Sequence, residues 1–228
     1  MLSAIILAAG QGKRLGAAVL KPLVKIAKLP AIIYSLNTLD KHPQIDEIIV
    51  VVNAKNQQAI KRLIRKYSFK KIKRFVLGGR RRQDSVYNGL KMASGNSDWA
   101  LIHDSARPFI DGETIAKVIL AAKKTGSAIV AVKPKATIKF SQKNNIVKET
   151  LDRDNLWEIQ TPQVFRKELL LQAYKKYGKE KVTDDASLVE KLGEDVLIVQ
   201  GSYQNIKITT GEDLLFAGLI AKRRRHAV

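Results

Sequence analysis

Short apolar runs alternate with amphipathic stretches along the first half of this chain, and this alternation restricts the folds that it can adopt. Five runs have the composition of buried β-strands: residues 5–8, 47–52, 75–77, 99–103 and 128–132. Helix-like segments lie between them, near residues 31–40, 56–66, 83–94 and 112–124. A strand that reaches a parallel neighbour through a helix forms a βαβ unit, and repeated units build a mostly parallel sheet between two layers of helices. The sequence therefore predicts an α/β protein with a Rossmann-like three-layer α/β/α architecture.

The alternation stops at Pro134, where two strand-like runs follow each other closely. Residues 136–140 and 146–150 alternate apolar and polar side chains, and the polar residues 142–145 between them are typical of a turn. This pattern predicts a protruding β-hairpin arm. Because an isolated hairpin is only marginally stable in water, we expect the arm to pack against a partner; an ordinary surface hairpin is the alternative.

Helical patterns return in the last third of the chain, near residues 167–177, 184–192 and 211–224, with a strand candidate at 196–199. Thr183 is the expected N-cap of the second of these helices. Thr210 and Asp213 resemble a capping box at the start of the third helix, with Asp in place of Glu. A chain of 228 residues with 45% apolar side chains can bury one core. We therefore expect a single domain over residues 1–228, with the arm inserted at 134–153.

A glycine-rich loop with basic residues follows the first apolar run. Its glycines and cations are Gly10, Gly12, Lys13, Arg14, Gly16 and Lys21. Glycine lets backbone N–H groups turn toward a ligand that comes close, and the cations add positive charge beside them. The loop is not a P-loop, because no Ser or Thr follows Lys13, and it is not a dinucleotide fingerprint, because Leu15 stands where the third glycine would be. We interpret it as a polyphosphate-binding loop; a plain strand-to-helix turn is the alternative.

The composition excludes several other classes of protein. The chain has no Cys, so it has no disulfide, no thiolate metal site and no cysteine nucleophile, which is consistent with a reducing compartment. No segment has 18 uncharged apolar residues, so we expect no membrane span. The first apolar run lacks a basic lead-in, so we expect no signal peptide. These features together predict a cytoplasmic protein.

The chain is strongly basic, with 41 Lys and Arg against 21 Asp and Glu and a net charge of +20. Such a balance points to nucleic acid, an anionic membrane or anionic small ligands. The cations of residues 61–66 recur at helical spacing, which indicates a solvated helix face, and no aromatic residues suited to base stacking are interleaved with them. We therefore favour small anionic ligands over nucleic acid, although they explain only a few of the cations.

Six motifs occur in the same order as in one enzyme family. They occupy residues 8–14, 78–86, 103–108, 152–157 with 161–163, 183–187 and 205–209. The first, Ala-Ala-Gly-Gln-Gly-Lys-Arg, is a signature of nucleotidyltransferases that join a sugar or polyol phosphate to a nucleoside triphosphate. Together the motifs resemble the 2-C-methyl-D-erythritol 4-phosphate cytidylyltransferase family of the non-mevalonate isoprenoid pathway. The resemblance implies Mg²⁺-dependent transfer of a cytidylyl group from CTP to the polyol phosphate, with release of pyrophosphate, by a homodimer that clasps through the arm.

The residue types suit this chemistry. The chain contains three His and no Cys, and it lacks the H-E-x-x-H and G-x-S-x-G motifs of hydrolases. A phosphate monoester that attacks the nucleotide is already anionic, so it needs little help from a general base. It needs in-line placement and neutralisation of charge on the triphosphate, which cations at loop positions can supply.

The resemblance implies roles for individual residues. The implied catalytic residues are Arg14, Lys21 and Lys207, of which Arg14 and Lys21 would stabilise charge at the α-phosphorus. The implied CTP-binding residues are Ala8, Ala9, Gly10, Gly12 and Lys13 in the triphosphate loop, Gly79, Arg80 and Ser85 around cytosine, and Ser105. The implied substrate-binding residues are Arg107, Thr137, Arg153, Thr161 and Thr183, with Thr137 and Arg153 reaching in from the partner subunit. For each threonine, turn or cap chemistry is the alternative, and for Arg107 it is pairing with a carboxylate that holds its own loop.

Asp104 is the candidate Mg²⁺ ligand. It follows the predicted strand 99–103, so its carboxylate should reach the edge of the sheet where ligands of α/β proteins bind. Mg²⁺ usually takes one or two carboxylates together with phosphate oxygens, and another divalent ion such as Mn²⁺ would suit the same ligand. A helix or turn cap is the alternative for Asp104, and support of the loop is the expected role of the neighbouring His103.

Some residues depart from the family pattern. The order Leu20-Lys21-Pro22 stands where the family usually has Pro-Lys-Gln, which leaves Lys25 as a second candidate for the catalytic lysine. Arg80 occupies a position that is frequently acidic or polar, and Ser105 replaces the usual Ala.

Two alternative functions stay open. The first is that of a ribitol 5-phosphate cytidylyltransferase, and the second, from a different class, is that of a basic nucleic-acid-binding module.

Overall fold

The computed structural model describes residues 1–10 and 20–225 of the chain. Within them, the central sheet has seven strands in the order β11-β7-β10-β6-β1-β4-β5. These are β1 (Leu2–Leu7), β4 (Glu47–Val52), β5 (Ile72–Leu77), β6 (Trp99–Asp104), β7 (Ser127–Val132), β10 (Glu158–Arg166) and β11 (Leu197–Gln200). Neighbouring strands run parallel, except that β10 is antiparallel to both β6 and β7. The predicted mostly parallel sheet is therefore confirmed.

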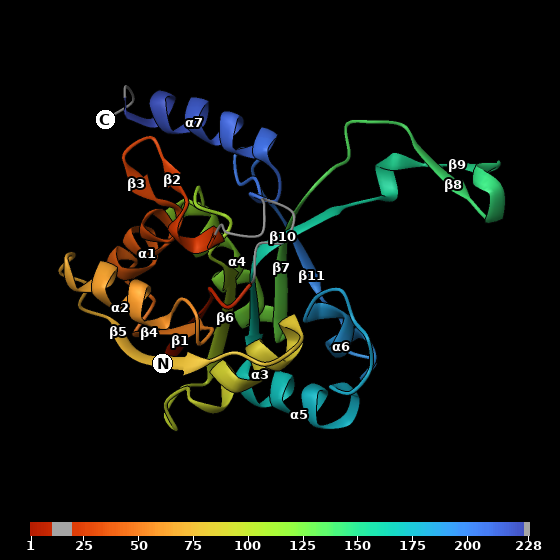
Figure 1. Ribbon diagram of the computed structural model, residues 1–228. Coiled ribbons are helices and arrows are strands. Elements are labelled where there is room, and N and C mark those ends of the chain that lie inside the picture. The colour runs from red at the N-terminus through yellow and green to blue at the C-terminus, as the bar shows by residue number, and fades with distance from the viewer. Residues whose placement is uncertain (11–19, 226–228) are drawn as a thin grey trace.

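Helices cover both faces of this sheet (Figure 1). One face carries α1 (Ala31–Lys41), α2 (Gln57–Arg65) and α4 (Gly112–Thr125), and the other carries α3 (Arg82–Lys91), α5 (Lys167–Tyr177) and α6 (Ala186–Glu190). In β1, Ile6 packs into the core on the first face and Ile5 into the core on the second, and both side chains are fully buried. A strand that is buried on both sides needs apolar residues at every position, which explains the continuous apolar runs of the sequence. The three-layer prediction is confirmed.

One central strand, β10, has no counterpart among the predicted strands. Its apolar pattern is interrupted by two glutamines and a proline, Gln160, Gln163 and Pro162. Its pairing with β7 also shifts register between Ile159 and Gln163. A strand with a register shift and buried polar side chains does not show the alternation or the apolar run from which strands are predicted.

The predicted arm is a β-hairpin of β8 (Ile138–Ser141) and β9 (Val147–Leu151), which pair antiparallel. The turn between them contains the 3₁₀ helix η3 (Lys143–Asn145), in which Asn144 and Asn145 adopt positive φ angles of 71° and 57°. Asn tolerates this left-handed region better than most residues, which fits its place in a tight turn. In Figure 1 the arm reaches away from the sheet on two extended segments, as the sequence predicts.

The helix α6 is shorter than predicted, because it begins at Ala186 and ends at Glu190. Thr183 is not its N-cap. Instead, the carboxylate of Asp184 accepts hydrogen bonds from the backbone N–H and the hydroxyl of Ser187, at 3.2 and 2.5 Å. A carboxylate is a stronger acceptor than a hydroxyl, and it takes over the capping of the first turn. The predicted helix is therefore present but extends over Ala186–Glu190 instead of 184–192, and the prediction that Thr183 caps it is wrong.

The last helix, α7 (Gly211–Arg225), begins as predicted. The carboxylate of Asp213 accepts hydrogen bonds from the N–H groups of Thr209 and Thr210, at 2.7 and 2.9 Å. α7 packs through Ala217 and Ala221 on a small core that includes Ile26 of the ribbon formed by β2 (Lys25–Ile26) and β3 (Leu29–Pro30). None of the helices in the described part of the chain is long and apolar enough to cross a membrane.

Candidate active site

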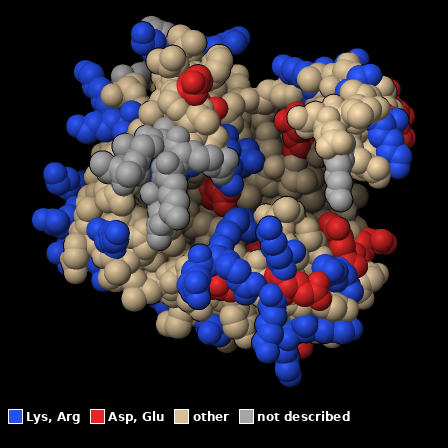
Figure 2. All heavy atoms as spheres, turned by 45° about the vertical axis from the view of Figure 1, so that its right-hand side comes forward, with Lys and Arg blue, Asp and Glu red and all other residues tan. Residues whose placement is uncertain are grey.

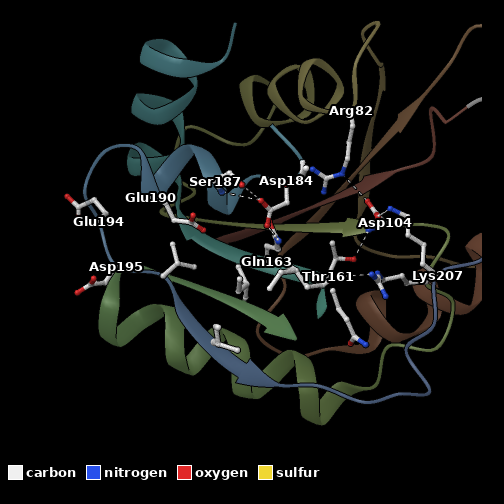
Figure 3. A pocket seen from close by; sticks show the side chains of 17 residues that line it. Arg82, Asp104, Thr161, Gln163, Asp184, Ser187, Glu190, Glu194, Asp195 and Lys207 are labelled. Atoms are coloured by element: carbon white, nitrogen blue, oxygen red, sulfur yellow. Dashed lines mark hydrogen bonds and ion pairs between the residues drawn. The ribbon is translucent and has the colours of Figure 1, made fainter. Parts of the chain in front are cut away.

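A cavity of about 520 Å³ opens beside the carboxyl end of β6 (Figure 3). One end of it is lined by Arg82, Asp104, Arg107, Thr161 and Lys207, which come from four separate segments of the chain. The other end extends toward α6 and β11, where it is lined by Gln163, Asp184, Ser187, Glu190, Glu194 and Asp195. The first end brings together a carboxylate and three cationic side chains, so it is the part of the cavity suited to anionic ligands and a metal ion.

Asp104 is the last residue of β6, and its buried carboxylate contacts two cations. Lys207 Nζ lies 2.6 Å from Oδ2, and Arg82 Nε lies 3.4 Å from Oδ1. Burial would raise the pKa of Asp104, but the charges of Arg82 and Lys207 outweigh it and hold the pKa well below its usual value. Asp104 is therefore an anion at neutral pH, as a metal ligand must be.

A buried histidine and a threonine fix the backbone beside Asp104. His103 Nε2 lies 3.0 Å from the carbonyl oxygen of Arg107, which is an acceptor, so Nε2 carries the proton. Burial lowers the pKa of His103 to about 4, so Nδ1 is unprotonated at neutral pH and accepts from the hydroxyl of Thr161 at 3.1 Å. The same hydroxyl accepts from the backbone N–H of Asp104 at 3.1 Å. This chain of hydrogen bonds holds the metal-ligand candidate in place and accords with the expected supporting role of His103.

Arg107 also holds its surroundings, but not by the contact expected from the sequence. Its Nη1 donates to the carbonyl oxygen of Asn205 at 2.7 Å, and its Nη2 donates to that of Ile159 at 3.2 Å. The alternative of pairing with a carboxylate is therefore wrong, because in the described part of the chain the guanidinium donates to carbonyl oxygens of β10 and of the segment before Lys207. Arg107 ties these two segments to the end of β6 and still lines the cavity.

The beginning of the glycine-rich loop is anchored at the same edge of the sheet. The side-chain amide of Asn56 donates to the carbonyl oxygen of Ala8 at 2.7 Å, and that of Asn53 donates to the carbonyl oxygen of Ala9 at 2.9 Å. These two asparagines have no role among the sequence predictions, because nothing in their local pattern points to the loop. Gly10 is exposed, whereas Gly12, Lys13 and Arg14 lie outside the described residues.

Lys21 lies near Lys207. It is the first residue of the 3₁₀ helix η2 (Lys21–Leu23), and its Nζ donates to the carbonyl oxygen of Ile208 at 3.3 Å. Two of the three predicted catalytic residues therefore converge, since Ile208 directly follows Lys207. Lys25, the second candidate, is exposed in β2.

The predicted cytosine-binding residues pack directly against the start of the loop. The N–H of Gly79 donates to Ser85 Oγ at 3.1 Å. A side chain on Gly78 would place its Cβ 2.6 Å from Ala9 Cβ and 2.7 Å from Ser85 Oγ, which is too close for any other residue. Residue 78 is therefore packed closely against Ala9 and Ser85, while Arg80 is exposed.

Ser105 is buried, and its hydroxyl donates to the carbonyl oxygen of Leu7 at 2.7 Å. Its side chain thus links the ends of β1 and β6, and its predicted contact with CTP stays a prediction.

The predicted polyol-phosphate ligands are divided between the cavity and the arm. Arg107, Thr161 and Thr183 line the cavity. Thr137 and Arg153 are exposed on the arm, where Arg153 Nη1 donates to the carbonyl oxygen of Lys135 at 3.1 Å, and they do not line the cavity of their own chain. Figure 2 shows a hollow between the arm and the rest of the molecule.

The residues present fit a metal ion that arrives with a nucleotide. Among residues 1–10 and 20–225, no group of three or more His, Cys, Asp or Glu side chains could hold a metal by itself. One ionised carboxylate is nevertheless enough for Mg²⁺ when phosphate oxygens supply further ligands. Asp104 provides that carboxylate beside cations that can neutralise the phosphates.

The chain matches one known protein family over nearly its whole length. The sequence model of the 2-C-methyl-D-erythritol 4-phosphate cytidylyltransferase family matches residues 2–223. The chain belongs to this family. The predicted resemblance is thereby confirmed.

Relatives and solved structures agree with this assignment. The chain is 45% identical over 227 residues to the 2-C-methyl-D-erythritol 4-phosphate cytidylyltransferase of Alkaliphilus oremlandii, covering 98% of this chain and 96% of the relative. It is 44% identical over 226 residues to that of Shouchella clausii, covering 98% of each. The fold matches the crystal structure of 4-diphosphocytidyl-2C-methyl-D-erythritol synthase from Anaerococcus prevotii with a TM-score of 0.87 and 38% identity, over 97% of this chain and 96% of that one. The predicted fold class is confirmed by this match.

Proposed function

We propose that this chain transfers a cytidylyl group from CTP to 2-C-methyl-D-erythritol 4-phosphate, giving 4-diphosphocytidyl-2-C-methyl-D-erythritol and pyrophosphate in the non-mevalonate route to isoprenoids. Membership of the family over residues 2–223 supports this activity. The observation that carries it in the structure is the ionised carboxylate of Asp104, which lies beside Lys207 and Arg82 at the edge of the sheet where the glycine-rich loop begins.

The reaction needs charge neutralisation more than it needs a base. An anionic phosphate oxygen of the polyol attacks the α-phosphorus of CTP, and the bond to the pyrophosphate leaving group breaks. Arg14, Lys21 and Lys207 are the proposed catalytic residues, since each adds positive charge near the reacting phosphate. A divalent ion held by Asp104, Mg²⁺ or Mn²⁺, supplies further neutralisation of the triphosphate when it is bound.

The remaining residues position the two substrates. In this proposal the backbone of residues 8–13 holds the triphosphate, while Gly79, Arg80 and Ser85 surround the cytosine. Ser105 acts by joining the ends of β1 and β6. Thr161 acts through His103 and the backbone of Asp104, because its hydroxyl is already engaged by both.

The polyol phosphate contacts Arg107 and Thr183 in the cavity and Thr137 and Arg153 from a partner subunit. This division supports a homodimer, since an arm that extends away from its own cavity is placed to reach another. The apolar side chains of Phe140, Ile146 and Val147 on the arm are 44%, 69% and 56% exposed, which would be costly without a covering surface. We therefore assign the arm at 134–153 to dimerisation of the single domain.

The activity is tested by pyrophosphate release from CTP and Mg²⁺ with each polyol phosphate in turn. The proposal predicts release with 2-C-methyl-D-erythritol 4-phosphate and little with ribitol 5-phosphate, the substrate of the first alternative. Release only with ribitol 5-phosphate, or with neither, would refute it. The second alternative, a nucleic-acid-binding module, predicts no nucleotide turnover at all.

A further inference from the structure

Arg82 contacts two carboxylates that lie far apart in the sequence. It is the first residue of α3, and its Nε is 3.4 Å from Asp104 Oδ1. A dashed line marks this contact in Figure 3. On the other side of the guanidinium, Nη1 is 2.8 Å from Asp185 Oδ2. The contact with Asp185 is the shorter of the two, so Arg82 is held more firmly by that residue than by the metal-ligand candidate.

Asp185 is a fixed partner, because its position is determined from several sides. Its side chain is fully buried. The hydroxyl of Tyr174 donates to its Oδ1 at 2.5 Å, and its backbone N–H donates to Gln163 Oε1 at 3.3 Å. Burial, and then the negative charge of Asp185, raises the pKa of Tyr174, so the tyrosine remains a proton donor to Asp185 at every pH of interest.

The exposure of these groups indicates which of the two contacts can open. The side chain of Asp104 is 10% exposed and lines the cavity, whereas that of Asp185 is completely inaccessible. Burial of Arg82 acts against its positive charge, but Asp185 and Asp104 together raise its pKa, so the guanidinium keeps its charge. A ligand can reach the contact between Arg82 and Asp104, and if it separates them, Arg82 still retains Asp185 as a counter-charge.

We propose that Arg82 is a positioning residue that competes with the divalent ion for Asp104, and that Asp185 is the anchor that lets Arg82 release it. The inference rests on the proposed function in one respect, namely the role of Asp104 as metal ligand. Without metal, Arg82 and Lys207 neutralise Asp104 and keep it in place. When a metal nucleotide enters, Arg82 turns to Asp185 alone, so that its guanidinium keeps a carboxylate partner.

The test measures the dissociation constant of Mn²⁺ in the presence of saturating CTP and without the polyol phosphate, by electron paramagnetic resonance of free Mn²⁺. In Arg82→Gln one competitor for Asp104 is absent, so we expect Mn²⁺ to bind at least about threefold tighter. In Asp185→Asn the size is preserved and the amide oxygen can still accept from Tyr174, but the negative charge and the second acceptor that hold Arg82 are lost. Arg82 then remains on Asp104, so Mn²⁺ should bind at least about threefold more weakly. The double variant should behave like Arg82→Gln, because Asp185 acts through Arg82.

Two controls accompany these variants. Asp98→Asn removes one negative charge that pairs with the N-terminal ammonium at the opposite end of β6, and it should leave the Mn²⁺ affinity unchanged. The affinity for CTP without metal is measured as well, because a direct contact between Arg82 and the triphosphate would make CTP bind more weakly to Arg82→Gln. That result, or shifts of the same sign in both single variants, would overturn the inference.

The design separates failure of this inference from failure of the proposed site. If Asp104→Asn binds Mn²⁺ with CTP as well as the unaltered protein does, Asp104 is not the metal ligand and the proposed site falls together with the inference. If Asp104→Asn loses Mn²⁺ binding but the Arg82 and Asp185 variants leave it unchanged, only the inference is refuted. Thermal unfolding shows whether each variant is folded, and either single variant is decisive if the other does not fold.

Discussion

Asp104 and Lys207 form the closest ion pair of the cavity, with 2.6 Å between Nζ and Oδ2. Lys207 is 40% exposed, so its side chain can move from the carboxylate toward an incoming phosphate. A lysine that stabilises Asp104 before substrate binds can therefore stabilise the developing charge afterwards. The same cation serves in both states, which suits a reaction whose nucleophile is already anionic.

Lys207→Ala tests this role. We expect kcat/KM to fall by about 100-fold or more, which is the usual effect of removing one preorganised charge-stabilising group. Steady-state pyrophosphate release measures the loss. Lys222→Ala removes an exposed cation on α7 and should leave kcat/KM within about twofold of the original value, so a similar loss in both variants would contradict a specific role for Lys207.

We expect the stability of the fold to depend on pH through the protonation of His103. Its pKa is lowered by burial to about 4, from a model-peptide value of 6.5, so the unfolded chain binds the proton more readily than the folded chain does. The stability contributed by the neutral imidazole is therefore complete above pH 6.5 and is lost as the pH falls toward 4, by about 3 kcal/mol in all.

Urea unfolding of the original protein and of His103→Gln at pH 7, 5.5 and 4 measures this contribution. The variant is expected to be less stable at pH 7, because contacts with Thr161 and the Arg107 carbonyl are weakened, but its stability should fall less steeply toward pH 4. Parallel curves for the two proteins would show that His103 does not titrate between these limits.

At the scale of secondary structure, prediction from sequence succeeds where burial imposes a simple pattern. β4 is buried at all six positions and is predicted with its observed bounds, Glu47–Val52. β10 is missed because buried Gln160 and Gln163 are satisfied by partners distant in sequence, which no local pattern reveals. α6 is predicted two residues too long at each end; at its start, Asp184 stands outside the helix, where its carboxylate accepts from Ser187 and from Gln163, which is distant in sequence.

The same limit applies to the site. Asp104 and Lys207 can be identified from their motifs, and the structure brings them into contact. Arg82 stands within a motif as well, but its role depends on residues 22 and 103 positions away in the sequence, so nothing local distinguishes it from its neighbours Arg80 and Arg81.

A mixing experiment tests the proposed dimer. Arg153→Ala removes a substrate ligand that the arm of one subunit is proposed to supply to the other subunit. Lys207→Ala removes a proposed catalytic residue from the cavity of the subunit that carries it. Each variant alone should be nearly inactive. When the two variants are unfolded and refolded together in equal amounts, half of the dimers contain one subunit of each kind. In such a dimer, one of the two sites combines a cavity that has Lys207 with an arm that has Arg153.

The mixture should therefore recover about a quarter of the original activity per subunit. Pyrophosphate release from the mixture, compared with each variant refolded by itself, is the measurement. Absence of recovery in a mixture that sedimentation shows to be dimeric would mean that Arg153 serves its own subunit, and a monomeric protein would exclude the dimer altogether.

The whole molecule carries a net charge of +20, and both substrates of the proposed reaction are anions. In Figure 2, Lys and Arg side chains gather below the hollow between the arm and the body. A field of one sign around a site raises the rate at which ligands of opposite charge arrive, and salt screens it over about 8 Å at physiological ionic strength. We therefore expect the surplus positive charge to raise the rate at which the anionic substrates associate with the protein.

We expect kcat/KM for CTP to decrease several-fold between about 0.03 and 0.3 M NaCl, while kcat changes much less, because steering affects arrival and not chemistry. Steady-state kinetics over this range provides the test. The pair Arg62→Glu and Arg65→Glu changes the net charge at two exposed positions of α2 and serves as the control. Independence of kcat/KM from salt would contradict steering.

In the proposed reaction a nucleotide triphosphate and a divalent ion meet at the ends of β1 and β6. A crystal structure of the protein with CTP and Mg²⁺ would show whether they do. We expect a metal ion about 2.1 Å from a carboxylate oxygen of Asp104, phosphates beside residues 8–14, and cytosine against Gly79 and Ser85. Nucleotide bound elsewhere, with Asp104 still paired to Arg82 and Lys207, would contradict this expectation.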